Sequence, residues 1–407
     1  MEIINSSIIN LDGWLNKNGW AGYDPYDIKG EPFFLHVQRL ASTGSIPFKV
    51  VRELVFALEA SYPLIARRMF GVKEEINPKA MGLFARAYLN LFQATGQEVY
   101  KDKALYCLMW LEQNPSQGYS GLCWGYPFDW QSQVLIPAGT PSAVVSSVVG
   151  DGFWTAYQVL GDRHYLAICE SICKFFLCDL NMDRLPGGHL CFSYTPVDNF
   201  HVHNANLFVA EFLCRIGKET GKQELVEIGS HAAGYALSEQ NPDGSLYYWG
   251  RIQNSYSPNT IDHYHSGFEI RALFGLWKQT GEAKYRQSVE KYYSFYRNNL
   301  ITQRDGLIAP KMTPRKFYPV NIHACAEAIL CNATLAEEFL EARKILPDLC
   351  EWVISKMQTE AGWFIYMIRR AKSGENRAEV PYMRWGQAWM LLALSQVLLR
   401  IGLVTKE

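Results

Sequence analysis

The sequence has no excess of either charge and no long apolar run. It carries 39 lysine and arginine residues against 40 aspartate and glutamate residues, spread along 407 positions. No basic block predicts a nucleic-acid surface, and no polybasic segment predicts binding to anionic lipid. No stretch reaches the roughly 18 consecutive apolar residues of a membrane helix. The N-terminus lacks the basic and apolar regions of a secretory signal. We therefore expect no nucleic-acid partner, no membrane span and no signal peptide.

Paired cysteines and the common cofactor motifs are also missing. The ten cysteines include no Cys-x-x-Cys pair, and many of them fall in apolar helical patterns. This usage is typical of reduced, buried thiols, so we expect a cytoplasmic protein. The sequence contains no Gly-x-Ser-x-Gly elbow, no phosphate-binding loop and no dinucleotide fingerprint. These absences argue against the enzyme classes that depend on such motifs, and we expect no cofactor.

A helical repeat is the strongest pattern that the sequence does contain. Four similar phrases end, about every sixty residues, at Gly96, Gly161, Gly221 and Gly281. An apolar helix is expected before each glycine and a more amphipathic helix after it. Glycine in this position supplies a left-handed helix C-cap without steric cost. The repeat unit is therefore a helical hairpin.

Six hairpins can be placed along the chain from the spacing of apolar residues. The buried helices are expected at residues 81–95, 146–160, 206–220, 266–280, 323–338 and 387–401. More amphipathic helices are expected at residues 97–113, 162–179, 222–239, 282–299 and 341–357. A sixth amphipathic helix is expected at residues 48–62. The pattern predicts an all-α (α/α)6 toroid, formed by residues 1–407 as a single domain whose N-terminal segment closes the ring.

Polar and aromatic residues gather where the buried helices are expected to start. Examples are Asn204, Tyr382, Arg384 and Trp385. In a toroid these starts meet at one mouth, and each helix N-terminus brings about half a positive charge to it. Because the helix ends and Arg384 are positive, we expect the pocket to bind an anionic ligand, such as a carboxylate or phosphate group on a sugar.

Three histidines, His203, His265 and His323, lie at these helix starts. A histidine there is suited to general acid or base catalysis near neutral pH. The alternative is that each one only caps a helix. The pairs His201-x-His203 and His263-x-His265 also suggest a metal site. However, no carboxylate or thiol lies at a matching ligand spacing. We expect a catalytic pocket without a metal.

An aromatic loop and a shorter N-terminal phrase supply candidate sugar contacts. The loop runs Cys123-Trp-Gly-Tyr-Pro-Phe-Asp-Trp-Gln-Ser132. Its Trp124, Tyr126, Trp130 and Gln131 suit a sugar-stacking wall, with Asp129 binding hydroxyl groups. The alternative is a plug that seals the ring. The phrase Gly22-Tyr-Asp-Pro-Tyr-Asp27 offers Tyr23 and Asp24 in the same way.

Carboxylates are the candidates for acid and base roles in hydrolysis. Most glycoside hydrolases need two of them across the scissile bond. The acid and base candidates are Asp129, Asp151, Asp262 and Glu269. Asp151 is expected to begin a buried helix, where burial would raise its pKa and suit a general acid. Its alternative role is a helix cap.

Two resemblances add context. The run Tyr382-Met-Arg-Trp-Gly-Gln-Ala-Trp389 resembles the Arg-Gly-Gln-Ala-Trp motif of unsaturated glucuronyl hydrolases, which are (α/α)6 enzymes of the six-hairpin glycosidase group, although Trp385 is inserted. In those enzymes two aspartates near the mouth carry the reaction; Asp151 is the candidate counterpart of one of them, and the second has no assigned counterpart. N-acylglucosamine 2-epimerases share the toroid and use paired histidines, which His203, His265 and His323 resemble only by type and location.

The whole chain is also similar to bacterial polysaccharide-biosynthesis proteins of the VpsJ type. The similarity is carried by the two phrases quoted above and by Phe192-Ser-Tyr-Thr-Pro196, Val202-His-Asn-Ala-Asn206, Gln240-Asn-Pro-Asp-Gly-Ser245 and Pro381-Tyr-Met-Arg-Trp385. It implies a role in bacterial surface-polysaccharide metabolism.

Three interpretations follow from the sequence. The first is a glycoside hydrolase that cleaves an anionic, uronate-containing oligosaccharide with carboxylates, with a lyase as its variant. The second is a cofactor-independent sugar epimerase or isomerase that uses histidine or tyrosine. The third is a glycan-binding protein without catalysis, which would show the aromatic wall but no paired acid and base.

Overall fold

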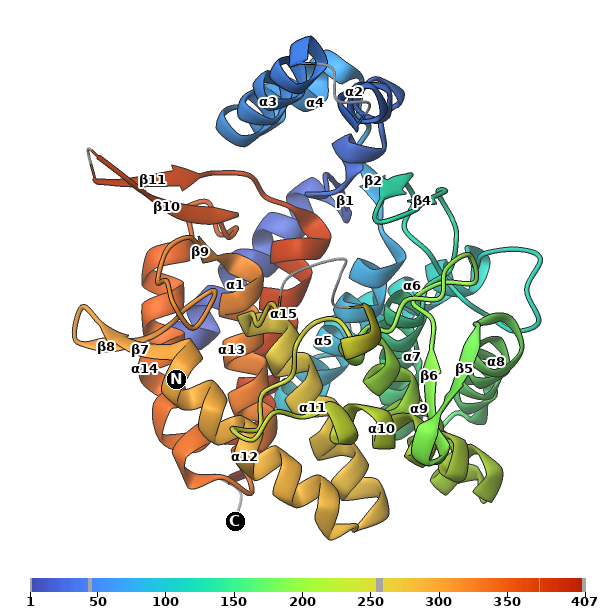
Figure 1. Ribbon diagram of the computed structural model, residues 1–407. Helices are drawn as coiled ribbons and strands as arrows, with labels where there is room; N and C mark the ends of the chain where they lie inside the picture. The colour runs from blue at the N-terminus through green and yellow to red at the C-terminus, as the bar shows by residue number, and fades with distance from the viewer. Residues whose placement is uncertain (1, 43–45, 254–258, 373, 405–407) are drawn as a thin grey trace.

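The computed structural model describes residues 2–42, 46–253, 259–372 and 374–404. Its helices form two concentric rings (Figure 1). In the inner ring, each helix packs against the next, and the last packs against the first. The inner helices are α5 (Pro78–Thr95), α7 (Ala143–Leu160), α9 (His203–Thr220), α11 (His263–Thr280), α13 (Ile322–Leu335) and α15 (Trp389–Val404). This closed ring is the predicted (α/α)6 toroid.

The outer ring covers the inner one helix by helix. Five outer helices lie close to the expected positions: α6 (Glu98–Gln113), α8 (Arg163–Asp179), α10 (Gln223–Glu239), α12 (Ala283–Leu300) and α14 (Leu340–Met357). The sixth is α1 (Glu2–Asn18), which packs against α14 and α15 through Ile4, Ile8, Leu11 and Leu15. The expectation that residues 48–62 form the sixth outer helix is therefore wrong.

Glycine caps set the ends of four inner helices. At Gly96 the backbone has φ 71° and its N–H donates to the carbonyl of Phe92 at 2.7 Å. Gly161, Gly221 and Gly281 have the same left-handed conformation. A side chain at such a position would be strained, which explains why glycine recurs there. In the fifth hairpin α13 ends at Ala336 without a glycine cap.

Short antiparallel strands lie in the connections between hairpins. The pairs are β1 (Ala21–Gly22) with β2 (Glu75–Ile76), β3 (Trp130–Gln131) with β4 (Leu135–Ile136), β5 (Met182–Leu185) with β6 (His189–Phe192), and β7 (Ile301–Arg304) with β8 (Leu307–Pro310). A three-stranded sheet has the order β11 (Gly374–Ala378), β10 (Met367–Ala371), β9 (Val320–Asn321). Strand β9 leads directly into α13, and a π-helical segment, Met383–Ala388, leads into α15.

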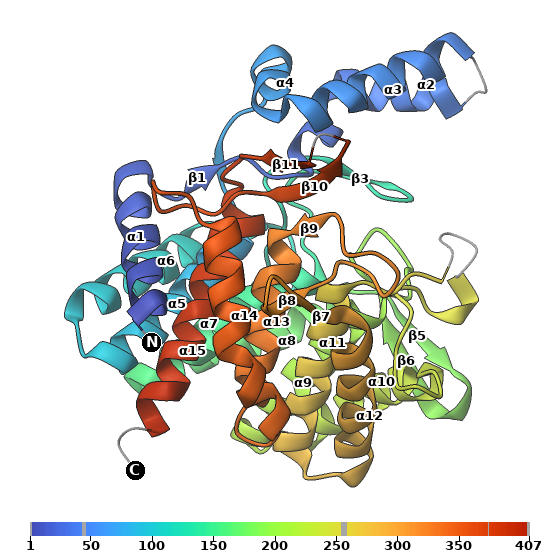
Figure 2. The same cartoon turned by 90° about the vertical axis from the view of Figure 1, so that its left-hand side faces the viewer.

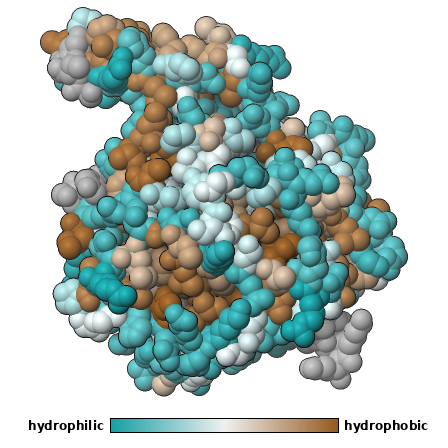
Figure 3. Space-filling view, turned by 90° about the vertical axis from the view of Figure 1, so that its right-hand side faces the viewer, coloured by the Kyte–Doolittle hydropathy of each residue, from teal (hydrophilic) through white to brown (hydrophobic). Residues whose placement is uncertain are grey.

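A small lobe stands off the toroid. It consists of α2 (Pro32–Ser42), α3 (Ile46–Ser61) and α4 (Pro63–Phe70), and Figure 2 shows it projecting above the rings. Ile28, Phe34, Ala66 and Val72 form its own apolar core. Its outer surface carries exposed apolar side chains, among them Ile46, Val50 and Leu54, and the lobe in Figure 3 is correspondingly brown in places. Within the described ranges, no helix is long and apolar enough to cross a membrane.

Candidate active site at the helix N-termini

A cavity of about 220 Å³ opens at the mouth of the toroid where the inner helices begin. Every inner helix, or the segment just before it, contributes at least one side chain. These are Lys79, Val144, Asn204, Tyr264, His265, Phe268, His323, Arg384 and Trp385. The expected convergence of helix starts is therefore present. Side chains that cap those helices fix the geometry: Asn77, Ser142, Asp262 and Asn321 each accept a hydrogen bond from a first-turn N–H.

Aromatic rings form most of the remaining wall. They are Tyr26, Tyr126, Trp130, Tyr194, Phe200, Tyr248 and Trp249. Trp130 lies against Tyr126 and Tyr194, with ring centroids 5.9 Å apart in both pairs. Flat apolar faces bordered by phenol hydroxyls can both stack on a sugar ring and hydrogen-bond its edges. Gln131 and Ser132 line the rim beside them.

His323 presents one ring nitrogen to the cavity. Its Nδ1 lies 3.1 Å from the carbonyl oxygen of Trp385, which can only accept a hydrogen bond, so Nδ1 carries the proton. The Nε2 atom consequently has a free lone pair. The ring stacks on Trp385 at 4.2 Å. Burial is the main cause that holds the pKa of His323 well below its ordinary value, so the imidazole is a neutral base at neutral pH.

His265 is oriented in the same way by a carboxylate. Its Nδ1 lies 2.7 Å from Oδ2 of Asp262, and Oδ1 of Asp262 caps the helix at 3.0 Å from the His265 N–H. The carboxylate fixes the tautomer and would stabilise the imidazolium formed when Nε2 accepts a proton. Both histidine rings contact Tyr264, with centroids 4.3 Å and 4.8 Å away. The cavity thus holds two oriented imidazoles around one tyrosine.

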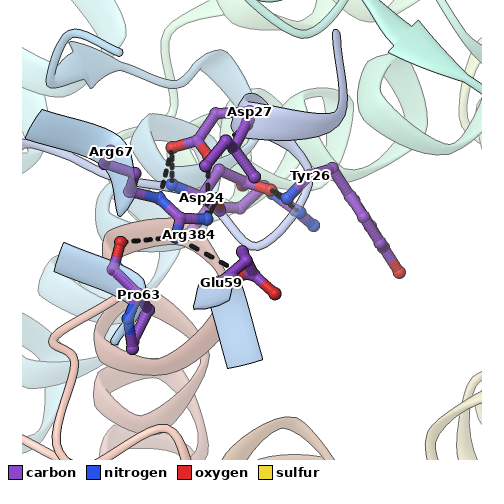
Figure 4. A network of polar contacts seen from close by, with 8 residues as sticks. Asp24, Tyr26, Asp27, Glu59, Pro63, Arg67 and Arg384 are labelled. Carbon is purple, nitrogen blue, oxygen red and sulfur yellow. Dashed lines mark hydrogen bonds and ion pairs between the residues drawn. The ribbon is translucent and has the colours of Figure 1, made fainter. Parts of the chain in front are cut away.

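Arg384 is held by an ion pair that joins the two ends of the chain. Its Nη2 donates to Oδ1 of Asp24 at 2.7 Å, and its Nε donates to Oδ2 of the same carboxylate. The guanidinium also lies 4.7 Å from the ring of Tyr126. Figure 4 shows Asp24 close to Arg384 and to a second arginine, Arg67, and the ring centroid of Tyr26 lies 5.6 Å from the Arg384 guanidinium. Since Tyr26 lines the cavity, the network positions one wall of the site.

Arg67, from α4 of the lobe, completes this network. It is fully buried and pairs with Asp27 at 2.8 Å while donating to the carbonyl oxygen of Asp24, also at 2.8 Å. Further contacts reach the Pro63 carbonyl and Glu59. The loop of residues 22–27 is therefore fixed from both sides, by the lobe and by Arg384.

No carboxylate lines the cavity among the residues that the structure describes. Asp262 and Asp24 are the carboxylates paired with the cavity residues His265 and Arg384. The described ranges also hold no group of three metal-ligating side chains. The site therefore offers histidine, tyrosine, lysine and arginine as its reactive groups.

Eight of the predicted site residues line the cavity: His265, His323, Tyr126, Trp130, Gln131, Asn204, Arg384 and Trp385. Asp262 and Asp24 lie directly behind them. The other predicted residues are placed elsewhere.

His203 and Trp124 are structural in this fold. The Nε2 atom of His203 pairs with Glu239 at 3.0 Å, between α9 and α10, and the ring packs on Tyr235. Trp124 is completely buried and donates from Nε1 to the Leu111 carbonyl at 3.0 Å. The expectation that Trp124 stacks on a sugar is therefore wrong, because its ring belongs to the core.

Asp129, Tyr23 and Tyr382 lie just outside the cavity. Asp129 accepts a hydrogen bond from the Ala138 N–H at 2.6 Å and holds its own loop closed. Tyr23 and Tyr382 pack against Arg67, with ring centroids 5.8 Å and 5.0 Å from its guanidinium. These three residues support the wall without lining it.

Asp151 lies in the middle of α7, not at its start, and the expectation of a raised pKa is wrong. Its carboxylate pairs with Arg215 at 2.5 Å and with Arg86 at 3.4 Å. Burial favours the neutral acid, but the two arginines outweigh it and lower the pKa. The ion pairs therefore stabilise the fold at neutral pH, and that contribution is lost as the pH falls through the lowered pKa.

This placement gives a direct test of Asp151 as a catalytic acid. We expect Asp151→Asn to lower the free energy of unfolding by about 1–3 kcal/mol, because the arginines lose a charged partner. Turnover should stay within about twofold of the unaltered protein, since the side chain does not line the cavity. Urea unfolding and an activity assay on the folded variant measure the two effects. If the variant folds but has no activity, Asp151 is a catalytic residue after all.

Lys79 and Tyr264 lie at the expected starts of buried helices, where polar and aromatic residues were expected to gather, but no role was predicted for either. Tyr26 belongs to the N-terminal phrase that was expected to contact sugar. Tyr194 and Tyr248 were missed, because they lie in connections whose path is set by tertiary packing.

No protein-family model matches this chain, and no curated protein sequence matches it. Several solved structures are similar to it in fold. An unsaturated glucuronyl hydrolase specific for heparin is 13% identical, with TM-score 0.62, and the match covers 100% of this chain and 97% of that one.

Two further structures have the same architecture. A glycoside hydrolase family 76 α-mannanase from Bacteroides thetaiotaomicron is 11% identical, with TM-score 0.61, covering 83% of this chain and 90% of that one. A sugar epimerase from a ruminal bacterium is 12% identical, with TM-score 0.59, covering 81% and 90%. At such identities the similarity establishes the fold alone, an (α/α)6 toroid.

Proposed function

We propose that this protein is a cofactor-independent sugar epimerase or isomerase. One observation carries the proposal: two oriented imidazoles, His265 and His323, line a cavity with no carboxylate among its described residues. The toroid supports a carbohydrate substrate, because its similar structures include a sugar epimerase and two glycoside hydrolases. Because of the resemblance to VpsJ-type proteins, we assign the proposed reaction to surface-polysaccharide metabolism.

The chemistry begins with an open-chain sugar whose carbonyl oxygen faces the cationic wall. Nε2 of one histidine removes the proton from the carbon beside the carbonyl, and the electron pair moves onto the oxygen to give an enediolate. We assign stabilisation of the developing negative charge to the hydroxyl of Tyr264, whose ring contacts both histidine rings. Return of a proton to the opposite face gives an epimer, and return to the neighbouring carbon gives an isomer.

Hydrolysis, the first interpretation of the sequence, requires a different set of groups. A hydrolase of the common type uses one carboxyl group as acid and a second as base or nucleophile. Asp262 is committed to His265 and Asp24 to Arg384. The cavity therefore supports proton transfer at carbon better than cleavage by paired carboxylates.

Incubation of the protein with a panel of aldoses, ketoses and uronate-containing oligosaccharides in D2O tests the proposal. We expect deuterium at the carbon beside the carbonyl, together with an epimer or isomer, in NMR spectra. New reducing ends without deuterium at carbon would establish hydrolysis, and an unsaturated product would establish a lyase. Binding without any reaction would favour the glycan-binding interpretation.

A further inference from the structure

Lys79 lies in the cavity wall without a partner. It is the second residue of α5, and only 3% of its surface is exposed. Its side chain makes no hydrogen bond or ion pair with any residue that the structure describes. Its Nζ atom faces two aromatic rings: the ring centroids of Trp389 and Phe268 lie 5.5 Å and 5.9 Å away. A buried amine in this setting can carry its charge only when an anion pairs with it, so the arrangement suits an anionic ligand.

The charges around Lys79 oppose its protonation in the free protein. Burial first, and then Arg384, hold the pKa of Lys79 well below its ordinary value, and Arg271 adds to the effect. Asp24 and Glu327 act in the opposite direction but are already paired with Arg384 and Arg271. His323 also faces Lys79, and as a neutral base it brings no counter-charge. The start of α5 is a further positive influence.

Arg384 offers a donor to the same space. Asp24 occupies its Nε and Nη2, whereas Nη1 has no hydrogen-bond partner among the described residues. Lys29 lies at the cavity rim, 5.1 Å from the ring centroid of Tyr26. The cavity therefore combines a deep amine, a free guanidinium N–H and a cation at the rim, with no described carboxylate to neutralise them.

We infer that Lys79 and Arg384 bind an anionic group of the substrate, a carboxylate or a phosphate, and that Lys79 takes up a proton when this group binds. The inference rests on the proposed function for the sugar part of the substrate and adds the class of substituent, a sugar acid or a sugar phosphate. The anion supplies the counter-charge that the free cavity lacks, so the ammonium form becomes favourable only in the complex. Binding and protonation are then linked, and each promotes the other.

Calorimetric titration with D-glucuronate, D-glucose 6-phosphate and D-glucose, repeated in buffers of different ionisation enthalpy, tests the inference. We expect an anionic sugar to bind at least about tenfold more tightly than glucose, with uptake of up to one proton. Tighter binding of glucuronate would identify a carboxylate site, and tighter binding of glucose 6-phosphate a phosphate site. Affinity should fall by up to about tenfold per pH unit above the pKa of free Lys79. Equal binding of all three sugars, or binding of none, would overturn the inference.

Three variants separate this role from a structural one. Lys79→Met should lose about 10- to 100-fold in affinity for the anionic sugar and all proton uptake. Lys79→Arg should keep anion binding but lose both proton uptake and the pH dependence, because arginine is already charged. Lys101→Gln, which removes a lysine from the surface of α6, is the matched control and should change nothing. Unaltered proton uptake in Lys79→Met or in Lys79→Arg would overturn the assignment.

These binding experiments test the anion site separately from the epimerase proposal. Proton-linked binding without deuterium exchange would support the anion site and contradict the epimerase proposal. Deuterium exchange into neutral sugars, with no preference for anionic ones, would support the epimerase proposal and contradict the anion site.

Discussion

His323→Gln is expected to lower turnover of the proposed epimerase or isomerase reaction by about 10²- to 10⁴-fold. The variant keeps the size and hydrogen-bonding capacity of the side chain, and its amide can still donate to the Trp385 carbonyl, but it has no basic nitrogen for the substrate. Since binding depends on the aromatic wall and the cations, affinity for the sugar should change little. Deuterium exchange measured by NMR, beside calorimetric binding, separates the two effects.

The same change at His265 provides a second test, and His203 provides the control. His265→Gln should also lower turnover by about 10²- to 10⁴-fold, whereas His203→Gln should keep turnover within about twofold, because His203 pairs with Glu239 outside the cavity. If only one cavity histidine proves essential, a single-base isomerase is favoured over an epimerase with a base on each face. Full activity of both His265→Gln and His323→Gln would contradict the proposal that histidines transfer the proton.

Removal of the Asp24 carboxylate is expected to have the largest effect on stability. Asp24→Ala leaves Arg384, which is 1% exposed, without its counter-ion, and the loss of one partner of a buried pair typically costs about 3–5 kcal/mol. Urea unfolding followed by tryptophan fluorescence measures the change. Sugar binding should fall as well, because the loop that carries Tyr26 loses an anchor.

An exposed pair gives the comparison for this prediction. Glu290→Ala removes one partner of the Arg286–Glu290 pair on the surface of α12, where both side chains are about half exposed. We expect it to change the free energy of unfolding by less than about 1 kcal/mol. A similarly small effect of Asp24→Ala would mean that the Arg384 ion pair does not hold the site together.

Local signals predicted the toroid well, because a helix end depends on residues close in sequence. The four capping glycines each terminate an inner helix, and the strong apolar patterns place the inner helices within a few residues. The sixth outer helix was misplaced because α1 and residues 48–62 both have an apolar face. Only packing against α14 and α15 distinguishes them.

The candidate site was predicted by location better than by residue. His265 and His323 line the cavity and His203 does not, although all three occupy the same place near a helix start. His265 is oriented by Asp262, three residues before it, whereas His203 and His323 are oriented by Glu239 and Trp385, which are distant in sequence. No local pattern specifies these distant partners. The same holds for Asp151, whose arginine partners come from α5 and α9.

The ion pair between Asp24 and Arg384 spans 360 residues of sequence, and a second link, from Gln358 to the Ser7 carbonyl, spans 351. A chain leaving the ribosome can therefore form its hairpins one after another, but it cannot close the ring until the last inner helix has emerged. Until then α5 has no α15 to cover it, and Asp24 has no arginine to bind. The binding site thus becomes available only at the final step of folding, and an incomplete chain would expose apolar helix faces without any ability to hold a ligand.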